Sequence, residues 1–220
     1  MRYLLLTFFC SFFIAAIALL PARLLESYLQ NYGISSFTLE GNLLTGTATS
    51  SRYPDSAFHW QLDLLSLITF SPSWQLKSAT GTFNLTPALT STNIKALNGY
   101  GRINDLLRLV TFPANLTGKY QLDIKHLDLS GCNENTVIQL TANRIHSKEP
   151  AINWGALQTD WTCENSSWQV IPILSNSEVK LNGRLVIGPD TNIVSELKFE
   201  SDNQQIQMNL NAITPSKANR

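Results

Sequence analysis

Cysteine carries the most specific chemistry in this chain, and it occurs three times, at Cys10, Cys132 and Cys163. The second stands in GCNEN (Gly131–Asn135) and the third in TCENS (Thr162–Ser166), 31 residues later. Each therefore has acid and amide side chains beside it. Two thiols can form a disulfide, supply half of a zinc site or act as a redox pair. The compartment in which the chain resides decides among the three.

The metal and redox interpretations need further residues. A zinc site requires two more ligands, and His126 and His146 would give the pattern H-x5-C-x13-H-x16-C. That spacing matches no compact zinc knuckle. A redox pair is usually closer in sequence and lies at the start of a helix. Both interpretations stay as alternatives to a disulfide.

Catalytic motifs are absent from the sequence: there is no H-E-x-x-H, G-x-S-x-G, P-loop or C-x-x-C. His126 lies between Asp123 and Asp128, an arrangement in which a carboxylate can orient an imidazole as a general base. No nucleophile accompanies these residues. We therefore expect no enzymatic activity, no cofactor and no metal, with a hydrolase centred on His126 as the alternative.

The first residues indicate the compartment. Leu4–Leu20 is a run of 17 residues without a charge, preceded by Arg2 and followed by Pro21. At about 1.5 Å per residue, a helix of this length spans roughly 25 Å of a bilayer. We predict a transmembrane signal anchor over residues 4–20, with residues 1–3 in the cytoplasm. A signal peptide cleaved at Ala16–Ala18 is the alternative.

Either form of this segment places the rest of the chain outside the cytoplasm. In an oxidising compartment, two exported cysteines favour a disulfide between Cys132 and Cys163. Closing the loop between them stabilises the fold by roughly 3.5–4 kcal/mol in the chain-entropy estimate. Cys10 lies within the apolar run, where we expect it to behave as a small hydrophobic residue.

Helical periodicity is confined to short stretches. Residues 21–33 carry leucines and tyrosines at helical spacing and stop at Gly33, which predicts a short amphipathic connecting helix. A second short helix is predicted over residues 103–111, with Asn104 as its cap. We expect residues 213–220 to form a disordered tail.

Between these segments, apolar and polar residues alternate, which is typical of strands with one buried face. We predict an all-β periplasmic domain over residues 34–212, an extended and curved antiparallel sheet of about ten to twelve strands. The alternating apolar residues include Phe58, Trp60, Leu62 and Leu64; Tyr120, Leu122 and Ile124; and Ile206, Met208 and Leu210.

The formal net charge is zero, from 16 basic and 16 acidic residues spread along the chain. No basic run is present to neutralise phosphates, so nucleic acid is not an expected partner.

Several segments occur in a familiar order: LEGNLLTGTA (Leu39–Ala48), HWQLDLLSL (His59–Leu67), GKYQLDIKHLDLSGC (Gly118–Cys132), Cys163 and LNGRLVIGPD (Leu181–Asp190). Together with the N-terminal anchor, they resemble the type II secretion system protein N family, also called general secretion pathway protein N. Asn42 stands where the family more often has threonine.

The resemblance implies a single-pass inner-membrane protein whose bulk lies in the periplasm, an accessory part of the machinery that exports folded proteins across the outer membrane. It implies no enzymatic activity and a periplasmic disulfide, Cys132–Cys163. The partners it implies are other secretion-system proteins, of the inner-membrane platform or the secretin. No small-molecule substrate is expected. The alternative function is a membrane-anchored β-groove that binds lipid or another hydrophobic ligand.

Overall fold

Strands occupy most of the chain where the sequence alternates between apolar and polar residues. The structure, a computed structural model, describes residues 20–24, 26, 37–50, 57–69, 71–79, 81–88, 93–104, 115–128, 131–188 and 193–213. The chain divides into two compact units, residues 1–79 and 80–220. The described residues form twelve strands, and in each unit the strands lie in the sheet in the order of the sequence. The predicted all-β, antiparallel class and strand number are confirmed.

The described residues of the first unit include four strands and the short helix α3: β1 (Phe37–Gly41), β2 (Thr45–Ser50), β3 (Phe58–Leu62), α3 (Leu64–Ile68) and β4 (Trp74–Ser78). Gly46 stands opposite Trp60 across β2 and β3. The indole of Trp60 lies so close that a Cβ on Gly46 would come within 2.2 Å of the ring. Glycine is therefore the residue that lets this indole pack flat against β2.

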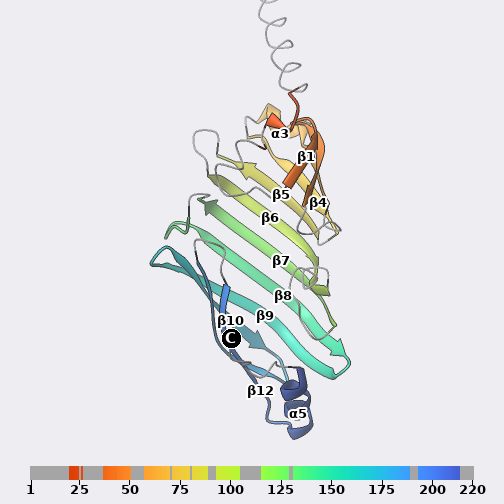
Figure 1. The fold of residues 1–220 in the computed structure, drawn as a ribbon, viewed down its shortest axis with the longest axis vertical. Coiled ribbons are helices and arrows are strands. Elements are labelled where there is room, and N and C mark those ends of the chain that lie inside the picture. Colours follow the sequence, from red (N-terminus) through yellow and green to blue (C-terminus); the bar gives the residue numbers. More distant parts are fainter. Residues whose placement is uncertain are drawn as a thin grey trace, which may run out of the picture. The chain divides into compact units, whose positions relative to one another are not determined.

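The described residues of the second unit form eight strands, and helix α5 follows the last of them: β5 (Gly81–Pro87), β6 (Ile94–Arg102), β7 (Leu116–Leu127), β8 (Val137–Lys148), β9 (Ala151–Glu164), β10 (Ser167–Ser175), β11 (Lys180–Ile187), β12 (Ile193–Glu200) and α5 (Gln204–Ile213). Figure 1 shows these strands as a strongly twisted antiparallel sheet with α5 after its last strand. The β7, β8 and β9 strands, of 12 to 14 residues, are the longest.

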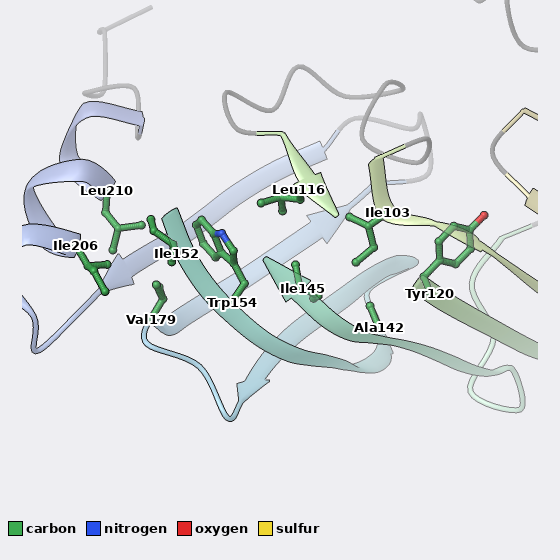
Figure 2. Close-up of a cluster of buried hydrophobic side chains, with 10 residues drawn as sticks. All are labelled: Ile103, Leu116, Tyr120, Ala142, Ile145, Ile152, Trp154, Val179, Ile206 and Leu210. Carbon is green, nitrogen blue, oxygen red and sulfur yellow. The ribbon is translucent and has the colours of Figure 1, made fainter. Parts of the chain in front are cut away.

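The core of the second unit lies on one face of its sheet and beneath α5 (Figure 2). Trp154 of β9 packs edge-on against Phe199 of β12, with ring centroids 5.7 Å apart. Its indole N–H donates a hydrogen bond to the Ser147 hydroxyl at 3.1 Å, so the buried polar atom has a partner. The cluster comprises Ile103, Leu116, Tyr120, Ala142, Ile145, Ile152, Trp154, Val179, Ile206 and Leu210.

Two strand predictions are wrong. Ile206, Met208 and Leu210 lie in α5, with exposed fractions of 7%, 59% and 1%. Spacing of i, i+2 and i+4 fits a strand, but residues i and i+4 also share one face of a helix. Asn203 determines the outcome, because its side-chain oxygen accepts a hydrogen bond from the Gln205 N–H at 2.9 Å and caps the helix.

Leu64 is the second exception, since it begins α3 instead of extending β3. The Asp63 carboxylate accepts a hydrogen bond from the Leu65 N–H at 3.0 Å, which caps this helix in the same way.

Several predicted segments lie mainly outside the described residues. These are the anchor, apart from Leu20; the connecting helix, apart from residues 21–24 and 26; most of the helix at 103–111; and residues 214–220. Pro21 forms a β-bridge with Asn42, so the predicted helix does not begin there, and Ile213 ends α5 and is not part of a tail. No helix among the described residues is long and apolar enough to cross a bilayer.

Candidate functional site

Cys132 and Cys163 come together on the second unit. Cys163 lies near the end of β9, and Cys132 lies in the connection between β7 and β8. The structure joins the two sulfur atoms in a disulfide, with the Cα atoms 5.7 Å apart. This separation is within the usual range for a disulfide. The bond therefore links the β7–β8 connection to β9, which pairs with the far edge of β8.

Hydrogen bonds fix the chain around Cys132. The Asn133 carbonyl oxygen accepts from the Thr136 N–H at 3.0 Å, and the Asn133 side chain accepts from the Asn135 N–H at 2.9 Å. The buried Thr136 hydroxyl donates to the His126 carbonyl oxygen at 2.7 Å. Residues 133–136 thus form a hydrogen-bonded turn directly after Cys132.

The surroundings of Cys163 are aromatic. Cys163 stands directly opposite Trp168 across β9 and β10. Trp168 also packs against Trp161, two residues before Cys163, with ring centroids 6.2 Å apart. Asn165 and Ser166 form the turn with φ of 50° and 59°, the left-handed conformation that a two-residue hairpin turn needs. The polar residues of TCENS thus build a tight turn beside the disulfide.

The described residues provide no metal site around these cysteines. No group of three or more His, Cys, Asp or Glu side chains gathers anywhere in the described part of the chain. The Nε2 of His146 lies 2.8 Å from the Thr117 hydroxyl, and its Nδ1 lies 3.1 Å from the Arg144 carbonyl oxygen. Both ring nitrogens of His146 therefore have partners on the sheet.

Asp123, one of the two carboxylates proposed to orient His126, has a different partner. One carboxylate oxygen of Asp123 lies 3.9 Å from the Lys125 ammonium group. The other is buried and has no hydrogen-bond partner in the described structure. His126 has φ of 56°, which turns its backbone out of the regular strand. Asp123 is thus paired with Lys125 and does not orient the imidazole.

Asp123 belongs to a polar hollow that the sequence did not predict. Asn84, Asn98 and Asp123 are neighbours in register across β5, β6 and β7. They line a shallow hollow of about 610 Å³ together with the exposed ring of Tyr100. The signal was present in the period-two pattern, because these residues occupy the polar positions of three strands. Their alignment depends on register, which the pattern does not specify.

The opposite face of the same strands is apolar and only partly covered. Leu85, Leu97, Ile124 and Ile138 are neighbours in register across β5 to β8. All four are of intermediate exposure, whereas the core residues near α5 are buried. This apolar row, which we define as Leu85, Leu97, Ile124 and Ile138, continues the core toward the opposite ends of these strands.

Together, these observations define an all-β protein with an antiparallel sheet cross-linked by one disulfide. Comparisons of the chain with protein-family models, with curated proteins and with solved structures found no match. The fold and the cysteine pair therefore define the class of this protein, a disulfide-linked antiparallel β-sheet protein.

Proposed function

We propose that the protein is an accessory inner-membrane component of the type II secretion pathway, acting on the periplasmic side by protein–protein interaction. The observation that carries the proposal is the pairing of Cys132 with Cys163 in a β-domain that follows an apolar N-terminal segment. Disulfides persist in exported domains and are rare in the cytosol. The assignment to the type II pathway rests on the order of segments, which resembles that of the secretion protein N family.

An interaction surface suited to this role is present on β10. Ile171 and Ile173 point to the same side of the strand, and each is 46% exposed. They stand opposite Asp160 and Gln158 of β9, so exposed apolar side chains lie beside polar ones. Apolar residues bordered by polar groups are typical of protein interaction sites. We assign the contact with a secretion-system partner to this pair of isoleucines.

A secretion assay tests the proposal. In a strain that lacks the gene, we expect proteins exported by the type II pathway to accumulate in the periplasm, and the wild-type gene to restore their release. Ile171→Asp together with Ile173→Asp should fail to restore release and should no longer co-purify with inner-membrane platform or secretin proteins. Val194→Asp, at a site that is 52% exposed on β12, is the matched control and should behave as wild type. Undiminished release from the deletion strain would overturn the proposal.

A second candidate function, binding of a lipid or another hydrophobic molecule, is favoured by the partly exposed apolar row. Leu97 and Ile124 are direct neighbours there, and their exposure leaves apolar surface for an acyl chain. Mass spectrometry of gently purified protein should then detect bound lipid, and Leu97→Asp should abolish it. Lipid-free protein would exclude this candidate and leave the first one untouched.

A further inference from the structure

The short helix α3 exposes its three leucines. Leu64, Leu65 and Leu67 are 65%, 72% and 40% exposed, although leucine is normally a buried residue type. Its polar residue faces the protein instead. The Ser66 hydroxyl donates to the Asp63 carbonyl oxygen and accepts a hydrogen bond from the Ser73 N–H at 2.9 Å. These leucines are therefore exposed, unlike the apolar residues of a helix that packs on a core.

These leucines lie at the end of the first unit where the chain emerges from its apolar segment. Pro21 forms a β-bridge with Asn42, and the Ala22 N–H donates to the Gly41 carbonyl oxygen at 3.0 Å. Two residues beyond Asn42, the Leu44 carbonyl oxygen accepts a hydrogen bond from Leu62, two residues before α3. Figure 1 shows α3 at the same end of the unit as the red stretch that begins at Leu20.

Further apolar and aromatic residues gather at this end. Leu20 and Leu24 are 39% and 59% exposed. Trp60 and Trp74 donate their indole N–H groups to the carbonyl oxygens of Asn42 and Leu43, at 3.0 Å and 2.9 Å. Tryptophan is enriched where membrane proteins meet the headgroup region.

We propose that α3 inserts its leucines into the interfacial region of the same bilayer that holds the N-terminal segment. The inference rests on the proposed membrane anchor. Residues 4–20 carry no charge, and the residue that follows them, Pro21, already forms a β-bridge with Asn42. Consecutive Cα atoms are about 3.8 Å apart, so this end of the unit lies within a few ångströms of the membrane surface.

The bilayer fits this surface better than a second copy or a partner protein does. The apolar segment ends one residue before the bridge, so its position already brings lipid to the exposed leucines. Outward-facing leucines beside an anchor gain contact with acyl chains without any partner. This second attachment would restrict rotation of the first unit about the anchor.

Site-specific labelling of the full chain tests the proposal. In a Cys10→Ser background, a single environment-sensitive fluorophore is attached at Leu65→Cys, and the protein is reconstituted into vesicles of phosphatidylethanolamine and phosphatidylglycerol. Met208→Cys, at a residue of α5 that is 59% exposed, provides the matched control. We expect a blue-shifted emission at position 65 that doxyl-labelled lipid quenches, and unshifted, unquenched emission at position 208. Leu67→Cys provides a second reporter on α3 and should behave as Leu65→Cys does.

An alkaline wash of the vesicles tests the membrane anchor separately from the insertion of α3. Protein that stays with the vesicles but has solvent-like emission at position 65 would overturn the role of α3 and leave the anchor intact. Protein that is released from the vesicles would overturn the anchor and this inference with it.

Discussion

Cys163 and Trp168 face each other across β9 and β10, and the sulfur of Cys163 is bonded to a residue outside that hairpin, Cys132. The bond therefore joins the β9–β10 hairpin to the connection between β7 and β8. Because β9 already pairs with β8, this covalent link ties the connection that precedes β8 to a strand that β8 also holds by hydrogen bonds.

Removal of the disulfide should lower the free energy of unfolding. For Cys132→Ser or Cys163→Ser we expect a loss of about 3–4 kcal/mol, because the unfolded chain gains the entropy of the opened loop. Urea denaturation of the variants and of the oxidised wild-type protein measures this loss. The double variant should be no less stable than either single variant, and Cys10→Ser should have no effect. Two titratable thiols from Cys132 and Cys163 in native protein that has been expressed in the periplasm would contradict the prediction.

Gly99 should be intolerant of a side chain because of Phe83. A Cβ on Gly99 would come within 2.0 Å of the Phe83 ring, directly opposite on β5. We expect Gly99→Ala to cost about 1–3 kcal/mol of stability through overpacking. In a Phe83→Ala background the same change should cost much less, because the ring is gone. Equal costs in the two backgrounds, measured by chemical denaturation, would show that the ring is not the cause.

Leu210 should contribute strongly to stability and Met208 hardly at all. Leu210 is 1% exposed beneath α5, whereas Met208 is 59% exposed on the same helix. We expect Leu210→Ala to lower the free energy of unfolding by about 3 kcal/mol through lost burial and a cavity. Met208→Ala should change it by less than about 0.5 kcal/mol. Similar losses for both variants would contradict the burial of one helical face.

The ion pair between Lys180 and Asp202 should make a small contribution at alkaline pH. The Asp202 carboxylate lies 2.8 Å from the Lys180 ammonium group. This hydrogen bond and the charge of Asp202 raise the pKa of Lys180 above its usual value of 10.5. A raised pKa in the folded state means that the contribution is fully present below pH 10.5 and is lost as the pH rises through the raised value.

Denaturation at a series of alkaline pH values measures this dependence, with Lys180→Met as the variant that lacks it. The difference should be small because both side chains are exposed to solvent. If the stability of the wild-type protein relative to Lys180→Met increased above pH 10.5, the pH dependence would have the opposite sign and the prediction would be wrong.

The strands could be predicted from the sequence because apolar and polar residues alternate along them. Tyr120, Leu122 and Ile124 alternate with Gln121 and Asp123, and this pattern by itself indicates β7. The same rule failed at Ile206, Met208 and Leu210, where three apolar residues at spacing two fit a helix equally well. The missing information was local: Asn203 and Asp63 are helix caps, and their positions would have indicated α5 and α3.

The cysteine pair was predictable from the number of cysteines and the predicted compartment, since only two cysteines follow the apolar segment. The hollow lined by Asn84, Asn98 and Asp123 was not, because it depends on the alignment of three strands. Alignment is set by turns and bulges, such as the irregularity between Thr86 and Pro87, and periodicity alone does not determine those.

The sequential strand order of the second unit also bears on how the chain folds as it is made. From β6 to β12, every strand pairs with the one made just before it. A chain that emerges amino end first can therefore add each strand to a completed edge without waiting for distant sequence. The newest strand always presents an unpaired edge until its successor arrives. Cys132 therefore remains a free thiol while β8 and most of β9 emerge. During that interval it can form a disulfide with a thiol other than that of Cys163.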